Sequence, residues 1–343
     1  MTGAAWHVVL SHAATAFAAS LLSTGAVLWI ARSKRFLDIP NERSSHSAPT
    51  PRSGGLGIVL GLAVALVTHG SSAGNPVTTL PMLVVACATG LRDDFRPLRP
   101  APKLVLVLVA GALSLTVAHV DAARAVPLVG DVPLGILGWP LTLLWLAGYA
   151  NGFNFMDGID GIAALTAGAS GLAFAAAGAR HGDGPLAAMG SAIAGAALGF
   201  LPWNFPKARI FMGDAGSLPI GMMLAFCAVW ASGSGALSFP ASVLLLGPFL
   251  FDVTFTLVGR ARAGKRLGQA HREHLYQRLT PPGRAHAPVS LLYVAFAVVT
   301  GALAIAYDRF GDTGRLLSLV APLGAMMAFG LSVLRRESRK GPG

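Results

Sequence analysis

Apolar runs of 16 or more residues recur along this 343-residue chain, with short polar loops between them. Only 12% of its residues are charged, and its mean hydropathy is +0.62. Because runs of this length form helices that cross or nearly cross a bilayer, the pattern predicts an all-α, polytopic integral membrane protein. It excludes a soluble globular protein, and residues 1–343 are expected to form one membrane domain.

The apolar runs predict about eleven transmembrane helices. They cover residues 8–30, 54–69, 77–91, 103–119, 134–149, 161–178, 185–201, 216–232, 239–258, 288–306 and 314–334. With the N-terminus outside, the cytoplasmic segments hold 22 of the 26 Lys and Arg residues, which predicts that orientation and a cytoplasmic C-terminus. The net charge of +11 is therefore mostly a topology signal, and nucleic acid is not an expected partner.

Two groups of acids lie at predicted cytoplasmic helix ends. Asp93 and Asp94 are adjacent, and such carboxylates repel unless a cation or a proton stands between them. The pair suits a divalent metal or a general base, although a solvated loop with arginine counter-ions explains it equally well. Asp214 stands between glycines directly before an apolar run, as a metal ligand or a helix cap would.

The segment NGFNFMDGIDG carries four oxygen-bearing side chains at three-residue spacing: Asn151, Asn154, Asp157 and Asp160. One turn of helix would align all four on one face, and oxygen ligands suit Mg²⁺. The glycines would let the backbone approach a phosphate at the start of the next helix. The alternative is an ordinary N-capped helix start.

Two further features leave alternatives open. The basic loop 259–287 could hold phosphate groups, or could simply be a positive-inside loop that touches anionic lipid. Asp252 lies inside the predicted ninth span, where an acid is either functional or paired with an arginine such as Arg260. Cys87 and Cys227 lie within apolar runs and are expected to be packing residues.

All of these loop acids fall at the predicted cytoplasmic face, whereas a transporter would more often place its acids near the midplane. The residues alone therefore indicate an enzyme or carrier that binds an anionic ligand and Mg²⁺ where membrane lipid meets water.

Four ordered motifs make the chain resemble the polyprenyl-phosphate N-acetylhexosamine-1-phosphate transferases. They are DIPNERSSHSAPTPRSGG, the Asp93–Asp94 pair with Lys103 downstream, NGFNFMDGIDGI, and NFPKARIFMGDAGSLPIG. The resemblance implies that undecaprenyl phosphate attacks the β-phosphorus of a UDP-N-acetylhexosamine. The products would be undecaprenyl-diphospho-sugar and UMP, with Mg²⁺ as cofactor. It implies a bacterial inner-membrane enzyme whose active site faces the cytoplasm, and such enzymes often form homodimers.

The resemblance also implies roles for individual residues. Asp214 and Asn154 would bind Mg²⁺, while Asp93, Asp94 and Asp157 would be catalytic. Asp93 would accept the proton of the lipid phosphate or otherwise activate it, with Asp94 in support; the alternative to this direct attack is a covalent aspartyl intermediate. Residues that would contact the nucleotide or its phosphates are Lys103, Gly158, Ile159, Asp160, Asn204 and Phe211. Residues of the first cytoplasmic loop that would lie near the site are Asn41, Arg43, Ser44, His46 and Arg52, although an ordinary mobile loop explains this segment equally well. Residues that would contact the sugar or diphosphate are His271, Arg272, His274 and Arg278.

The last cytoplasmic loop reads AHREHLYQRL, which resembles the O-antigen-initiating branch and differs from the peptidoglycan enzymes. We therefore expect the first step of a lipopolysaccharide-type surface glycan. The alternatives are a UDP-N-acetylglucosamine enzyme of teichoic acid or common-antigen synthesis and, from another class, a lipid-linked sugar transporter.

Overall fold

The computed structural model describes residues 3–34, 36–39, 49–69, 76–115, 118–269, 271–281 and 283–338. Its first half contains α1 (Gly3–Ser33), β1 (Leu37–Asp38), β2 (Thr50–Pro51), α2 (Gly55–Thr68), α3 (Pro76–Phe95), α4 (Pro100–Leu115), β3 (Ala122–Val126), β4 (Gly130–Pro133), a short 3-10 turn (Gly135–Leu137) and α5 (Gly138–Met156). Its second half contains α6 (Ile162–His181), α7 (Gly184–Asn204), α8 (Asp214–Ser234), α9 (Phe239–Leu245), α10 (Gly247–Arg262), α11 (Leu275–Leu279), α12 (Ala287–Tyr307) and α13 (Asp312–Ser338).

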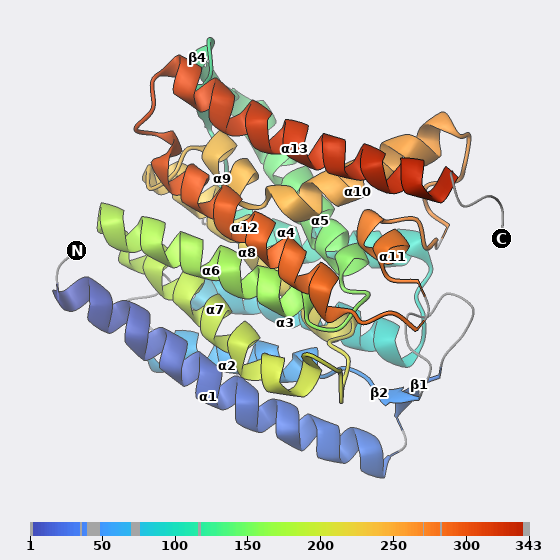
Figure 1. Cartoon of the computed structure of the whole chain (residues 1–343). Helices are drawn as coiled ribbons and strands as arrows, with labels where there is room; N and C mark the ends of the chain where they lie inside the picture. The colour runs from blue at the N-terminus through green and yellow to red at the C-terminus, as the bar shows by residue number, and fades with distance from the viewer. Residues whose placement is uncertain are drawn as a thin grey trace.

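The long helices lie side by side in one bundle (Figure 1). Among the described residues, six helices are long and apolar enough to cross a membrane: α1, α6, α7, α8, α12 and α13. The α9–α10 pair, bent by 79°, makes a seventh if it is one span. Each of the eleven predicted runs corresponds to one helix or to this bent pair. An all-helical integral membrane protein is thus confirmed, while the count of eleven spans and the orientation stay predictions.

Helix α8 forms the centre of the bundle, and 94% of its most apolar stretch is buried. Glycines let other helices approach it closely. A Cβ added to Gly90 of α3 would lie 2.0 Å from the carbonyl oxygen of Asp214, and one added to Gly55 of α2 would lie 2.3 Å from the Cα of Gly216. Because such contacts leave no space for any other side chain, they fix α2 and α3 against the start of α8.

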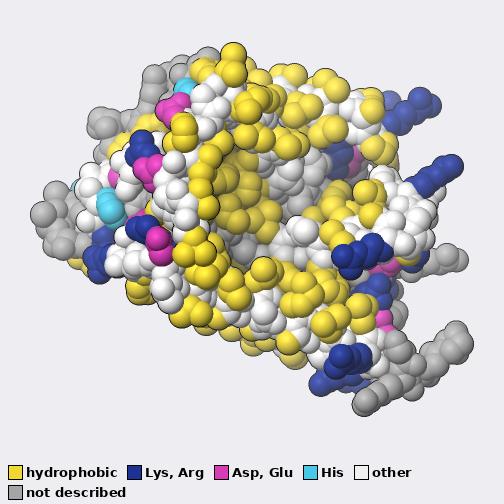
Figure 2. Space-filling view, turned by 90° about the horizontal axis from the view of Figure 1, so that it is seen from above, with side chains coloured by type: hydrophobic (Ala, Val, Ile, Leu, Met, Phe, Trp, Pro, Cys, Tyr) yellow, Lys and Arg dark blue, Asp and Glu magenta, His cyan; other side chains and the backbone are white. Residues whose placement is uncertain are grey.

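The surface is divided by polarity. Charged side chains concentrate toward the two ends of the molecule, and hydrophobic side chains cover the band between them, which is hollowed near its middle (Figure 2). Two apolar cavities lie along α10. One of about 600 Å³ is lined by α10 and α13, and the other of about 460 Å³ is lined mainly by α5 together with Phe239 and Leu250. This distribution fits a protein embedded in lipid.

Two small antiparallel sheets lie at opposite ends of the bundle. The β1–β2 pair and α11 lie where α13 finishes, whereas the β3–β4 hairpin lies at the other end (Figure 1). The acidic end of α3 and the first residue of α8 lie near β1–β2, since Phe211 and Met212 accept backbone hydrogen bonds from Gly54 and Gly55 at 2.9 Å. This end of the bundle carries the candidate site.

Candidate functional site

Asp94 joins three segments that are distant in sequence. Its Oδ1 accepts a hydrogen bond from the backbone N–H of Asp214 at 2.9 Å, and its Oδ2 accepts one from Ala215 at 3.2 Å. The Ser53 hydroxyl donates to Oδ2 at 2.7 Å, and the Arg52 guanidinium lies 3.0 Å from Oδ1. Asp94 therefore caps α8 from α3, where an anion also suits the helix dipole.

Lys103 of α4 bridges two acids of the site. Its ammonium donates to Asp93 at 3.2 Å and forms a shorter bond to Asp214. The other oxygen of Asp93 accepts a hydrogen bond from the backbone of Leu98 at 2.6 Å. Burial would lower the pKa of the nearby Arg52, but the charges of Asp94 and Asp214 raise it, so this guanidinium stays charged.

The segment 151–161 differs from its predicted shape. Helix α5 ends at Met156 and α6 begins at Ile162, so the expectation that one helical turn aligns its four oxygen-bearing residues is wrong. Asn154 faces α8, where its amide donates to the Ser217 hydroxyl at 2.8 Å. Asp160 lies beyond the break and contacts His286 at 3.1 Å. The backbone leaves the helix at Asp157 and turns at residues 159–161, where Gly161 has a φ of +78°, and this turn separates the two ends of the motif.

Asp157, the C-cap of α5, lies among other acids. Loss of solvent around its carboxylate, together with the charges of Asp214 and Asp94, raises its pKa to about 8. A carboxyl with such a pKa is mostly protonated at neutral pH unless a cation binds near it. Burial is the main cause of this shift and the neighbouring acids add to it, so a cation bound nearby would change the protonation state of Asp157.

The expected nucleotide-binding residues lie around the same turn. Asn204 accepts a hydrogen bond from Gly161 N–H at 2.8 Å and donates to the Ile210 carbonyl at 3.0 Å, so it ties the 157–161 turn to the segment before α8. Ile159 is buried, and the Phe211 backbone N–H donates to Pro51 at 2.9 Å. Gly158 packs against Tyr276, whose hydroxyl a Cβ at this position would meet at 2.1 Å.

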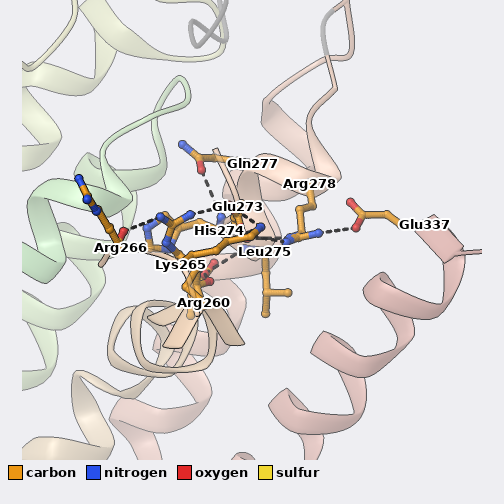
Figure 3. A network of polar contacts seen from close by, with 11 residues as sticks. Arg260, Lys265, Arg266, Glu273, His274, Leu275, Gln277, Arg278 and Glu337 are labelled. Atoms are coloured by element: carbon orange, nitrogen blue, oxygen red, sulfur yellow. Dashed lines mark hydrogen bonds and ion pairs between the residues drawn. The ribbon is translucent and has the colours of Figure 1, made fainter. Parts of the chain in front are cut away.

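The basic loop after α10 is organised around Glu273, as Figure 3 shows. Arg260, Lys265 and Arg278 all lie within ion-pair distance of its carboxylate. Burial would raise the pKa of Glu273, but the bond from Lys265 and the charge of Arg260 lower it overall. Arg278 also pairs with Glu337 of α13, so this arginine anchors the loop to the C-terminal helix.

The other loop residues are held in different ways. Arg272 donates to the Thr280 carbonyl at 2.9 Å. Burial and the neighbouring cations lower the pKa of His271 to about 4, so it is neutral at physiological pH. His274 is only 2% exposed and faces Asp252 at 3.2 Å. An ion pair with Arg260 is one of the two explanations that the sequence leaves open for Asp252. That explanation is wrong, because Arg260 pairs with Glu273 instead.

Of the first-loop residues, Asn41, Arg43, Ser44 and His46 lie outside the described residues, whereas Arg52 is part of the site. Several neighbours of the site were missed by sequence reasoning: Ser53, Glu273, Tyr276, His286 and Ser290. Ser53 stands inside a motif that was singled out, so its position was a usable signal. Glu273 and Tyr276 stand inside AHREHLYQRL and His286 stands in the basic loop 259–287, but nothing in those segments distinguished these three residues from their neighbours. Ser290 lies in an apolar run, and all four become visible only through their contacts.

The donor chemistry of the site fits a hard cation. Four acids, Asp93, Asp94, Asp157 and Asp214, are opposed by two cations in the described ion pairs, Arg52 and Lys103. Fully ionised, they leave two negative charges in excess. In the described part of the chain, no group of three His, Cys, Asp or Glu side chains is arranged to hold a metal by itself. Mg²⁺ commonly binds to one or two carboxylates and to substrate phosphates, without an all-protein cage.

Comparisons with known proteins place the chain in a family. The profile of glycosyl transferase family 4 matches residues 77–232. Over 360 residues the chain is 32% identical to decaprenyl-phosphate N-acetylglucosaminephosphotransferase of Mycobacterium leprae, covering 93% of this chain and 88% of that protein. Over 280 residues it is 30% identical to the probable undecaprenyl-phosphate N-acetylglucosaminyl 1-phosphate transferase of Bacillus subtilis, covering 79% and 78%.

A phospho-N-acetylmuramoyl-pentapeptide-transferase of Synechococcus is 34% identical over 218 residues, which cover 59% of this chain and 62% of that protein. The fold and the acidic site thus occur in a membrane-embedded transferase of glycosyl transferase family 4. The chain belongs to the polyprenyl-phosphate N-acetylhexosamine-1-phosphate transferases of that family.

Proposed function

We propose that this protein transfers an N-acetylhexosamine 1-phosphate from its UDP-sugar to undecaprenyl phosphate and releases UMP. The observation that carries the proposal is the meeting of Asp93, Asp94, Asp214, Arg52 and Lys103 at one end of an apolar bundle. Acidic and basic side chains that meet at the start of a helix suit phosphoryl transfer. This reaction needs alignment of the reacting groups and neutralisation of phosphate charge more than covalent chemistry.

In this reaction an oxygen of the lipid phosphate forms a bond to the β-phosphorus of the nucleotide sugar. The bond between the β-phosphorus and the bridging oxygen breaks, and UMP leaves with that oxygen and its electron pair. Asp93, which carries Lys103 on one oxygen, accepts the lipid phosphate's proton when that phosphate arrives protonated. Lys103 and Arg52 orient and neutralise phosphate oxygens, and Asp94 holds α8 in place.

Mg²⁺ would supply charge neutralisation on the diphosphate. Asp214 and Asn154 would hold it, because Asp214 is the first residue of α8 and Asn154 of α5 contacts the first turn of α8 through Ser217, beside the excess negative charge. With only these two protein ligands, phosphate oxygens of the substrate would complete the set of oxygen ligands. Asp157 would lose its proton as the cation binds, because a nearby positive charge favours the ionised carboxylate.

The two substrates would approach from different directions. The apolar cavities along α10 suit the prenyl chain, since one of them extends to Arg262 at the start of the basic loop. The polar segments around Gly158, Asn204 and Phe211 suit the nucleotide. The predicted orientation would place this active site at the cytoplasmic face, and the resemblance to the family would place the protein in the inner membrane.

The identity of the sugar and of the glycan is also part of the proposal. The loop sequence favours O-antigen initiation, while the names of the Mycobacterium and Bacillus relatives favour N-acetylglucosamine as the donor sugar. UDP-N-acetylglucosamine is therefore the first donor to test. The N-acetylfucosamine and N-acetylquinovosamine nucleotides follow it, because they are donors for the O-antigen branch.

The test measures nucleotide release by purified protein in detergent, with and without undecaprenyl phosphate and Mg²⁺. We expect UMP, and only when both are present. Release of UDP would instead indicate ordinary glycosyl transfer and refute the mechanism. No release with any of the three donors would favour the transporter alternative.

Two variants with the same chemical change sharpen this test. Asp214→Asn should abolish UMP release, because it removes a charged ligand and the partner of Lys103. Asp312→Asn is the matched control, because its half-exposed side chain lies at the start of α13, away from the acidic site. Full activity of the Asp214 variant would remove this residue from the mechanism.

A further inference from the structure

Asp252 of α10 is completely buried and holds the first turn of α11. The backbone N–H groups of Leu275 and Tyr276 donate to its two oxygens at 3.0 and 3.1 Å. The first N–H groups of a helix have no partner within that helix, so Asp252 caps α11 from a different helix. The Tyr293 hydroxyl of α12 also donates to Asp252, which brings three helices to one carboxylate.

Each oxygen of Asp252 faces a backbone N–H group of α11, so both oxygens act as hydrogen-bond acceptors. Besides the two backbone amides and Tyr293, the Thr256 hydroxyl donates to Asp252 at 3.2 Å from one turn further along α10. An ionised carboxylate accepts from all of them. An asparagine would turn an NH₂ group toward at least one of these donors, so one bond to α11 or α12 would be lost.

Tyr276 of α11 links Asp252 to the candidate site. Its hydroxyl donates to the Phe155 carbonyl at 2.9 Å, and its ring fills the space that a side chain at Gly158 would need. Phe155 and Gly158 flank Asp157, which feels the charges of Asp214 and Asp94. The position of α11 therefore sets the position of the turn that follows α5.

We propose that Asp252 is a positioning residue for the nucleotide-sugar site. It holds α11 so that Tyr276 supports the end of α5 and the 157–161 turn, and so that Arg272 stays at one place in the basic loop. This inference rests on the proposed function and adds to it a residue outside the acidic cluster. Among the described contacts, no hydrogen bond of Asp252 reaches Asp93, Asp94 or Asp214. Loss of the Asp252 carboxylate should therefore weaken binding of the UDP-sugar donor more than it slows the chemical step.

The kinetic test compares three variants. Asp252→Asn should raise the KM for the UDP-sugar about tenfold while kcat changes less than about threefold, as expected when binding rather than chemistry is lost. Tyr293→Phe should shift KM in the same direction by a smaller factor, because it removes one of the bonds between helices. Thr256→Val is the matched control, because its lost bond lies within α10 and anchors no other element. A fall in kcat at unchanged KM would overturn the proposal.

The second measurement needs no substrate. Hydrogen exchange of peptides from residues 271–281 should be faster in Asp252→Asn than in the wild type and unchanged in Thr256→Val, because either the Leu275 or the Tyr276 amide would then face an NH₂ group and lose its acceptor. Exchange at the wild-type rate in Asp252→Asn would overturn the proposal whatever the activity. Where Asp252→Asn does not fold, Tyr293→Phe takes its place in both measurements. If the wild type released no UMP, the proposed function would fall and the exchange result would still decide the role of Asp252.

Discussion

Replacing Gly90 by alanine should disable the site without touching any of its charged residues. The added Cβ would lie 2.0 Å from the carbonyl oxygen of Asp214, whereas ordinary contact begins at 3.4 Å. The Asp214 oxygen belongs to the backbone, and the position of a Cβ is fixed by its own backbone, so neither atom can turn away. Helices α3 and α8 must therefore separate by 1.4 Å at this point. Asp94 lies one turn further along α3 and would move away from the α8 amides that it caps. A misplacement of about 1 Å at a reacting centre costs about 100-fold in rate.

The assay is the initial rate of UMP release, measured beside the midpoint of thermal unfolding in detergent. Gly90→Ala should lose about 100-fold in rate, and overpacking of this kind costs about 1 to 3 kcal/mol of stability. Gly324→Ala in α13 is the control, because its Cβ meets nothing within 4 Å. It should match or exceed the wild-type stability, since alanine favours a helix over glycine. A Gly90 variant with wild-type rate and unfolding midpoint would refute the close contact and the role given to it.

Three further predictions concern single side chains. Because the pKa of Asp157 is raised to about 8, its proton stabilises the metal-free fold at low pH, and that stabilisation should fade as pH rises toward 8. The unfolding midpoint in a chelator should show this slope, and Asp157→Asn should flatten it. Phe211→Ala should raise the KM for the donor, since stacking on a base is worth about 1 to 3 kcal/mol; an unchanged KM removes Phe211 from the nucleotide pocket. Ser53→Ala removes a bond to the Asp94 carboxylate that is worth about 1.5 to 3 kcal/mol, so its unfolding midpoint should fall, and a wild-type midpoint would contradict this.

The helical segments could be predicted because a bilayer requires long apolar runs, and such runs are visible in sequence. The predicted span 54–69, for example, nearly coincides with α2 (Gly55–Thr68). The run 239–258 also exists, but it breaks at Leu246 into two helices bent by 79°. Hydropathy sums a window of residues and does not register a change of helix direction within it.

The candidate site could be predicted as a set of residues but not as a geometry. Asp93 and Asp94 stand out because adjacent carboxylates repel unless a cation or a proton stands between them, and Asp214 stands out between glycines directly before an apolar run. Their mutual contacts depend on glycines, since Gly90 brings α3 against α8, and a glycine in an apolar run does not show which helix it will meet. The alignment of the NGFNFMDGIDG oxygens failed because the helix ends within the motif.

The role of Asp252 lay beyond sequence reasoning for another reason. Two of its donors are backbone N–H groups, which every residue except proline possesses. Such contacts leave no pattern of residue types in the sequence. The arginine partner that charge alone had suggested, Arg260, lies with Glu273 instead.

The cap that Asp94 places on α8 makes assembly of the protein and formation of its active site a single event. One carboxylate is shared by the turn before α2, the end of α3 and the start of α8, so a chain in which α3 has not packed against α8 has neither the capped helix start nor Asp94 beside Arg52. A partly inserted chain therefore cannot act on lipid phosphate. Measured activity would therefore indicate that the chain has folded completely in the membrane, because the acids reach their positions only when the helices around them have packed together.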